Sequence, residues 1–290
     1  MSLSLFSSLP HLALLVYCMM AVFHQQALVF YNSMLLSFDS RGLASGLGVA
    51  VGYISSAIAL VFLARLMSVP DVFFQASFLF ALLVLPSLLL LPNPPQREMV
   101  KIKEVLKDRK FLLTILAILS LTEVANTLIA MMGIYLKRVY GFEDTQIYRV
   151  IGLSAFGGVV GGMVFGRLAD RWGASKLFPM GFFFWSFFLA LLYFTSEHLI
   201  LLAGFLAGLS LAHLWTTSRL FVIENFPQTQ VSLRLSFLSL TERIASTSGL
   251  FAWSLLLYLT GDNYRLSALL MIAFPLLGFI SFRKSRVVSL

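Results

Sequence analysis

The sequence consists of long apolar stretches separated by short polar connections, and this pattern constrains the fold most strongly. A helix that crosses a lipid bilayer needs about twenty mostly apolar residues. By this criterion we predict about nine spanning helices, at Pro10–Leu36, Gly46–Leu66, Val72–Leu91, Phe111–Leu136, Gln146–Leu168, Leu177–Phe194, Leu199–Ile223, Ser236–Leu259 and Leu266–Phe282. Only 12% of the residues are charged, which is about half the fraction found in soluble domains. We therefore expect an all-α polytopic membrane protein embedded in the lipid bilayer.

The distribution of Lys and Arg predicts the orientation of these helices. Basic side chains are enriched in the cytoplasmic loops of membrane proteins. If the C-terminus is cytoplasmic, the predicted inner segments hold roughly three times as many Lys and Arg residues as the outer ones. An odd number of spans then puts the N-terminus on the outer side. The basic residues that give the net charge of +8 are thus explained by their role in orienting the helices in the membrane. We expect no nucleic-acid partner. The short loops favour a bacterial plasma membrane.

The longest predicted connection, Pro92–Lys110, divides three helices from six. We predict a partial N-terminal bundle over residues 1–92, a cytoplasmic linker over 93–110 and a six-helix C-terminal bundle over 111–290. Within the linker, Val100, Ile102, Val105 and Leu106 alternate with lysines. This spacing predicts a short amphipathic helix on the membrane surface.

The fifth predicted span is rich in glycine and ends in a charged turn. Its glycines recur at intervals of four, as in Gly157/Gly161, Gly158/Gly162 and Gly162/Gly166, which predicts one bare helix face that a neighbouring helix approaches closely. The turn that follows resembles the loop signature of the major facilitator superfamily, G-x-x-x-D-R-x-G followed by basic residues. The matching residues are Gly166, Asp170, Arg171, Gly173 and Lys176. The alternative is an ordinary basic cytoplasmic turn.

Other segments are similar to the vacuole-effluxer branch of that superfamily, the autophagy-related permeases. They are Val29–Leu35, Arg41–Gly48 with Gly52-Tyr53, Thr122–Thr127, and Thr216–Arg219. The resemblance implies helices four to twelve of a twelve-helix transporter, so that a preceding N-terminal segment, or a partner subunit in its place, is missing. It also implies efflux of amino acids or similar small metabolites, and an acid at Asp170 that latches the cytoplasmic side shut against the N-terminus of an adjacent helix.

Glu123 is the first candidate for chemistry, because a charged side chain in the middle of a membrane span is costly. Asn126 and Thr127 follow at i+3 and i+4 and share its helix face. We expect this group to face the central cavity and to bind a substrate or a coupling proton. The alternative is a protonated carboxyl that ties two helices together.

A second polar set lies on the seventh span, where His213, Thr216 and Thr217 have the same spacing. His213 could carry a coupling proton and pair with Glu123, or it could be a neutral packing residue. We expect Arg219 and Glu224, nearer the cytoplasm, to act in gating, with Arg219 alternatively binding an anionic substrate group. Arg243 is expected to form an interhelical salt bridge, with Glu224 as its candidate partner. On the first span, Gln25 and Asn32 share one face and are cavity candidates.

The sequence contains no phosphate-binding G-x-x-x-x-G-K-[ST] and no H-E-x-x-H or G-x-S-x-G motif. The single cysteine, Cys18, rules out a disulfide within the chain and a cysteine metal site, and we expect no cofactor and no resident metal. We therefore predict a secondary transporter of a small molecule by alternating access. The alternative is a non-transporting membrane protein used in assembly or sensing, and a membrane enzyme lacks positive support.

Overall fold

The computed structural model describes residues 9–59, 69–90 and 101–287, and every regular element within them is helical. The longer helices are α2 (Pro10–Ser33), α3 (Arg41–Ile58), α4 (Val69–Leu90), α6 (Arg109–Tyr140), α7 (Asp144–Trp172), α9 (Met180–Phe194), α10 (Ile200–Asn225), α11 (Val231–Leu259) and α13 (Ala273–Val287). The shorter ones are η1 (Met34–Ser37), α5 (Ile102–Lys107), α8 (Ala174–Leu177), η3 (Glu197–Leu199), η4 (Gln228–Gln230) and α12 (Tyr264–Leu270). The predicted linker helix corresponds to α5, in which Val105 is fully buried; Val100 lies outside the described residues.

Within the described residues, 6 helical stretches are long and apolar enough to cross a membrane. They are Pro10–Ser37, Arg109–Tyr140, Asp144–Trp172, Ala174–Phe194, Glu197–Asn225 and Tyr264–Val287. Helices α3, α4 and α11 occupy the other three predicted positions. The described parts of α3 and α4 border segments outside the described residues, and α11 carries Arg234, Glu242 and Arg243. The count of nine spans therefore stays a prediction.

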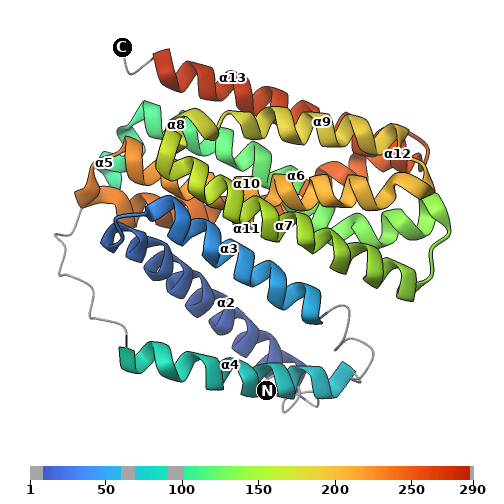
Figure 1. Cartoon of the computed structure of the whole chain (residues 1–290), viewed down its shortest axis with the longest axis horizontal. Coiled ribbons are helices and arrows are strands. Elements are labelled where there is room, and N and C mark those ends of the chain that lie inside the picture. The colour runs from blue at the N-terminus through green and yellow to red at the C-terminus, as the bar shows by residue number, and fades with distance from the viewer. Residues whose placement is uncertain (1–8, 60–68, 91–100, 288–290) are drawn as a thin grey trace.

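Helix α7 lies between α3 and α10, and its glycines explain why both can approach it (Figure 1). A Cβ atom at Gly157 would meet the backbone of Phe205 on α10, whereas one at Gly162 would meet the carbonyl of Gly46 on α3. The expectation of one bare face was too simple, because neighbouring residues on a helix point about 100° apart. Two glycine rows bring two helices within backbone contact distance, and this close packing supplies attraction that lipid cannot.

The other long helices after residue 101 are α6, α9, α11 and α13. Helix α6 packs against α11 and α13. It begins at the N-cap Asp108 and ends at Gly141, whose φ of 71° suits glycine. An aromatic cluster of Phe178, Phe221 and Phe282 joins α10 and α13 to the start of α9. In Figure 1, α13 lies along the upper side of the molecule, whereas α2 lies in its lower part.

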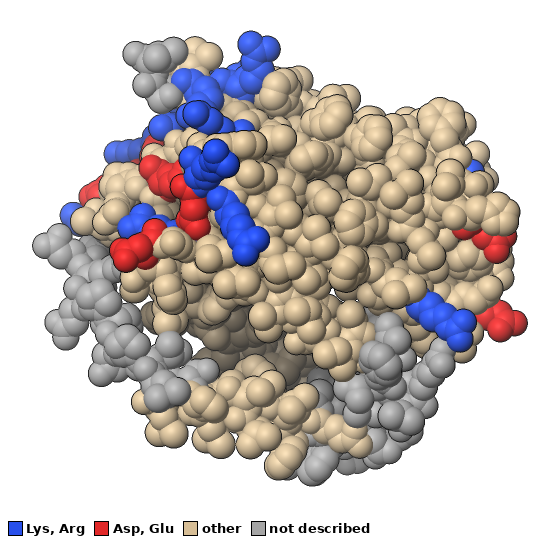
Figure 2. Space-filling view, viewed as in Figure 1, with Lys and Arg blue, Asp and Glu red and all other residues tan. Residues whose placement is uncertain are grey.

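Charged side chains gather at the two ends of the molecule and leave an uncharged belt between them (Figure 2). The larger group, at the left in Figure 2, covers the end where α5, α8 and the C-terminal end of α13 lie. The sequence predicts that the end richer in basic residues faces the cytoplasm. We therefore refer to it as the cytoplasmic end.

Candidate functional site

Arg219 on α10 connects the C-terminal bundle to α2 and α3. Its Nε donates to Ser45 Oγ at 2.7 Å, its Nη1 to Asn32 Oδ1 at 2.9 Å, and its Nη2 to the carbonyl of Ser45 at 2.8 Å. The guanidinium carbon lies 5.8 Å from the centroid of the Tyr31 ring. Arg219 is only 7% exposed, and the described residues place no carboxylate within ion-pair distance of it. Neutral dipoles from two other helices thus hold a buried positive charge.

A pocket of about 200 Å³ opens beside this guanidinium, between α2, α10 and α11. Its lining residues are Leu28, Asn32, Trp215, Ser218, Arg219, Leu238 and Glu242. We refer to it as the Arg219 pocket. Because Arg219 and Glu242 line the same small space, the pocket presents a guanidinium and a carboxyl group to a solute. Of the predicted substrate residues, Asn32 belongs to it directly.

Sequence reasoning missed four residues of this site as ligands: Ser45, Trp215, Ser218 and Glu242. Ser45 and Ser218 each stand inside a segment that resembles the vacuole-effluxer branch, and that resemblance was the available signal. Trp215 carried no such signal, because one aromatic residue in an apolar helix is ordinary packing material.

Glu123 is 5% exposed and packs against α11, not into the Arg219 pocket. Its Oε1 lies 2.5 Å from Ser248 Oγ, which also lies 2.7 Å from the carbonyl of Ile244. A serine hydroxyl has one hydrogen and cannot donate to both oxygens at once. Both contacts are satisfied if Glu123 is protonated and donates to Ser248, while Ser248 donates to Ile244. The geometry therefore fits a neutral Glu123, as the helix-tying alternative requires.

The neighbours of Glu123 on α6 also face α11. Asn126 Nδ2 donates to the backbone carbonyl of Glu242 at 3.0 Å. Glu123 Oε2 and Thr127 Oγ1 are both buried without a hydrogen-bond partner among the described residues. A Cβ atom at Gly249 would meet both of these oxygens, so the glycine on α11 provides the space above them. Glu123, Asn126 and Thr127 thus lie together, as predicted from their spacing. They face the interface between α6 and α11, whereas the sequence predicted that they face a central cavity.

His213 does not join Glu123, which corrects the proposed pairing. Its Nε2 lies 2.9 Å from the carbonyl of Leu177, and its ring packs edge-on against Phe165 and Phe184. The ring is completely buried, and its Nδ1 has no partner within the described part of the chain. These surroundings suit the neutral packing residue that the sequence left as an alternative.

The two threonines that follow His213 are also buried. Thr217 donates to the carbonyl of His213 at 2.8 Å, whereas Thr216 Oγ1 has no partner among the described residues. The carbonyl of Thr216 accepts a hydrogen bond from Ser45 Oγ at 3.2 Å. Thr216 thereby touches the Arg219 network through its backbone.

Asp170 bridges the two parts of the chain at the cytoplasmic end. Its carboxylate accepts hydrogen bonds from the backbone N–H groups of Gly42 at 2.6 Å and Leu43 at 2.8 Å, in the first turn of α3. Gly166 permits this approach, because a Cβ atom there would meet the carbonyl of Gly42. Negative charge at a helix N-terminus is favourable. Asp170 on α7 thus caps α3, a helix that lies more than a hundred residues earlier in the chain.

The remaining signature residues have simpler surroundings. Gly173 ends α7 with a φ of 83°, a conformation that favours glycine. Arg171 and Lys176 are exposed at the cytoplasmic end.

Glu224 makes a comparable cap inside the C-terminal bundle. Its carboxylate accepts from the backbone N–H groups of Ala174 at 3.0 Å and Ser175 at 3.2 Å, at the start of α8.

The expected Glu224–Arg243 salt bridge is therefore wrong. With the Gln25 amide oriented so that its oxygen faces α11, Arg243 Nη2 and Nε donate to that oxygen at 2.6 and 2.5 Å. Gln25 and Asn32 thus reach α11 and α10 from the same face of α2.

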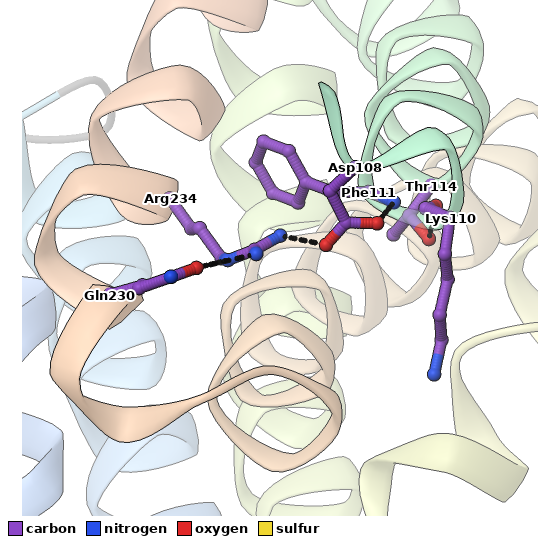
Figure 3. Close-up of polar contacts among 6 residues, drawn as sticks. All are labelled: Asp108, Lys110, Phe111, Thr114, Gln230 and Arg234. Carbon is purple, nitrogen blue, oxygen red and sulfur yellow. Dashed lines mark hydrogen bonds and ion pairs between the residues drawn. The ribbon is translucent and has the colours of Figure 1, made fainter. Parts of the chain in front are cut away.

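A further cluster fixes the start of α6 to α11 (Figure 3). Asp108 Oδ2 lies 2.8 Å from Arg234 Nη1, while its Oδ1 accepts from the N–H of Phe111 at 3.0 Å. Gln230 Oε1 accepts from Arg234 Nη2 at 2.6 Å. The Arg234 guanidinium lies 4.6 Å from the Phe111 ring and 4.5 Å from the Phe226 ring, so cation–π contacts support it. This cluster anchors the end of the predicted linker.

Comparison with known proteins agrees with this architecture. Residues 113–288 match the Major Facilitator Superfamily. An uncharacterized protein of Aquifex aeolicus (strain VF5) is 53% identical over 286 residues, which cover 99% of this chain and 76% of that protein. The crystal structure of a bacterial homologue of the iron transporter ferroportin, in an outward-facing state, aligns with a TM-score of 0.58 and 21% identity.

That alignment covers 88% of this chain, and the chain spans 65% of the length of the ferroportin homologue. At this identity the likeness concerns the fold alone. The superfamily match covers more than half of the chain and, with the apolar helices, identifies an integral, multi-pass membrane protein. The chain belongs to the major facilitator superfamily.

Proposed function

We propose that this protein is a secondary transporter that moves a small solute through the Arg219 pocket by alternating access. The single observation that carries the proposal is the position of Arg219, which is buried where α2, α3 and α10 meet. In transporters built from two bundles, the substrate site lies between them near the bilayer midplane. A solute bound here touches both parts of the chain and is sensitive to their relative movement.

The pocket favours a solute that carries charges of both signs. Arg219 offers a fixed cation, Glu242 lines the opposite helix, and Asn32 and Ser218 add neutral hydrogen-bonding groups. An amino acid matches this combination, because its carboxylate and its ammonium lie a few bonds apart. The segments that resemble the vacuole-effluxer branch support the same substrate class, and they support export as the direction.

Glu123 supports proton coupling in this proposal. Its hydrogen-bond geometry suits the neutral carboxyl, while the unpaired Oε2 and Thr127 Oγ1 leave an incomplete polar cluster. Movement of α11 relative to α6 would change the surroundings of the carboxyl and thereby its affinity for a proton. We place the protein in the bacterial plasma membrane, as the short loops and the relative from Aquifex aeolicus support.

Counterflow in proteoliposomes tests the proposal. The purified protein is reconstituted into proteoliposomes, which are loaded with a mixture of unlabelled amino acids. The uptake of each radiolabelled amino acid is then measured without an imposed ion gradient. We expect uptake of at least one amino acid by the wild type. Arg219→Lys keeps the charge but loses the planar fork of donors, so it should raise the apparent KM by about tenfold or more.

The matched control is Arg243→Lys, because Arg243 lies on α11 outside the Arg219 pocket and is exposed. It should leave the KM within about twofold of wild type. Absence of counterflow for every amino acid would overturn the substrate class and favour the alternative of a non-transporting membrane protein. Equal effects of the two substitutions would remove Arg219 from the substrate site.

A further inference from the structure

Within the described residues, every hydrogen-bond acceptor of Arg219 lies across a helix interface from it. Arg219 belongs to α10, whereas its acceptors, Asn32 Oδ1 and both oxygens of Ser45, belong to α2 and α3. Tyr31, whose ring lies beside the guanidinium, is also on α2. The described helices α6 to α13 supply no hydrogen-bond acceptor to this side chain. The partners of the buried cation therefore depend on how α2 and α3 pack against α10.

Ser45 lies in the same part of α3 as the contacts that join this helix to α7. The N–H of Gly42 donates to Asp170 Oδ1 at 2.6 Å, and a Cβ atom at Gly46 would meet the carbonyl of Gly162. The segment from Gly42 to Gly46 spans little more than one helical turn, and a hydrogen-bonded turn moves as a unit. Separation of α3 from α7 at the cytoplasmic end therefore also draws Ser45 away from the guanidinium.

Loss of Ser45 leaves the guanidinium without two of its three acceptors. Arg219 is only 7% exposed, and a buried charged donor that loses its partners costs more free energy than a neutral one. Glu242 lines the same pocket, but no ion pair joins it to Arg219 among the described residues. While the pocket is empty, this cost opposes the separation of α3 from α10. A carboxylate in the Arg219 pocket offsets the cost, because its two oxygens fit the planar donors of a guanidinium.

We propose that the carboxylate of a solute replaces Ser45 as the acceptor at Arg219, so that binding of an anionic group favours opening of the cytoplasmic end. Ser45 is then a positioning residue, which holds the guanidinium and keeps α3 in place while the pocket is empty. A ligand shifts a conformational equilibrium only by its difference in affinity for the two states. A carboxylate has such a difference, because it binds more tightly to a guanidinium that Ser45 has left. This inference rests on the proposed function, since it concerns the regulation of the same pocket.

Double electron–electron resonance measures the opening directly. Spin labels at Ser40→Cys and Lys176→Cys, in a Cys18→Ser background, report the distance between the start of α3 and α8. Both positions are exposed, and Ser40 makes no side-chain capping bond. The protein is held in nanodiscs at constant pH and ionic strength and titrated with acetate or with acetamide, which has a similar shape but no charge. At saturation, acetate should raise the ratio of open to closed protein by about tenfold, whereas acetamide should leave it within about twofold.

Three substitutions assign the effect to Arg219. Arg219→Met keeps the length of the side chain but removes its charge, so it should abolish the difference between acetate and acetamide. Arg265→Met is the matched control, because Arg265 is partly buried and donates to the carbonyl of Tyr193 at 3.2 Å within the C-terminal bundle. This variant should keep the wild-type response.

Ser45→Ala removes one acceptor from the closed state. It should raise the open population in the absence of acetate and retain the response to acetate. In the Arg219→Met background, the same change should have little further effect, because Ser45 acts through Arg219. A purely structural contact of Ser45 would produce the same shift in both backgrounds.

Two results would overturn the proposal. One is an equal open population of the wild type in acetate and in acetamide, a comparison that requires no variant to fold. The other is an acetate response that persists in Arg219→Met, because the anion then acts elsewhere. The counterflow assay is independent of both. A response to acetate without counterflow of any amino acid removes the substrate class but keeps the role of Arg219, whereas counterflow without a response to acetate removes that role.

Discussion

The backbone N–H of Gly42 donates to Oδ1 of Asp170 at 2.6 Å, although the two residues lie 128 positions apart in the chain. The contact joins α3, which precedes the linker, to the end of α7 in the C-terminal bundle. It closes the cytoplasmic end of the interface, at the rim of a polar pocket that Glu224 also lines. We therefore expect this contact to break when the protein opens to the cytoplasm.

Asp170→Asn should therefore shift the protein toward the inward-open state. The amide replaces one acceptor oxygen by a donor that faces an N–H, and the favourable charge at the N-terminus of α3 disappears. A charge at an exposed helix end contributes about 0.3–1 kcal/mol, so we expect a roughly two- to fivefold change in the population ratio. Labelling of Ser218→Cys by a membrane-impermeant maleimide from the cytoplasmic side, in a Cys18→Ser background, reports this shift.

Glu224→Gln is the matched control for Asp170→Asn. It weakens a comparable cap that lies wholly within the C-terminal bundle. It should lower stability without raising the labelling of position 218. If Asp170→Asn leaves labelling unchanged, or if both substitutions raise it equally, Asp170 is not a latch.

Gly46→Ala should destabilise the interface between α3 and α7. A Cβ atom there would overlap the carbonyl of Gly162 and crowd Gly166, and neither backbone can move aside locally. Overpacking of this kind costs about 1–3 kcal/mol. Unfolding by sodium dodecyl sulfate in mixed micelles measures the loss. Gly52→Ala on the same helix is the control, because nothing lies within 4 Å of its added Cβ, and similar losses in the two variants would contradict the packing argument.

Glu123→Gln should uncouple transport from the proton gradient. Glutamine keeps the shape and can donate to Ser248, but it cannot ionise. In proteoliposomes, accumulation driven by a pH gradient should disappear, while exchange of the same amino acid at equal pH should continue. Ser248→Ala removes only the hydrogen-bond partner and should retain gradient-driven uptake. Wild-type accumulation by Glu123→Gln would assign the residue a structural role.

Reporter fusions test the predicted topology. We expect a fusion after Leu290 and a fusion within the linker to give cytoplasmic signals, because the basic residues of both segments are retained on that side. The residues in question include Lys101, Lys107 and Arg283. Fusions to green fluorescent protein and to alkaline phosphatase report opposite sides of the membrane. Opposite signals from the two sites would overturn the predicted orientation.

Local features of the sequence determined the helical character of the chain and much of its division into elements. Lipid requires every backbone group to be paired within its own segment, so an apolar stretch such as Phe111–Leu136 can be placed without knowing its neighbours. The turn at Asp170 can also be placed from sequence alone. The glycine spacing before it indicates that another helix packs closely, and the charged residues indicate the membrane surface.

Only the tertiary structure decided which polar side chains meet. By sequence, His213 was a candidate partner of Glu123. The spacing of residues along one helix defines a face of that helix but does not show which helix packs against the face. The structure turns Glu123 toward Ser248 on α11 and His213 toward the carbonyl of Leu177. Arg219 meets Ser45 across 174 positions of chain, since two rows of glycine on α7 draw α3 and α10 together. Such pairings depend on packing between distant segments, which no local pattern encodes.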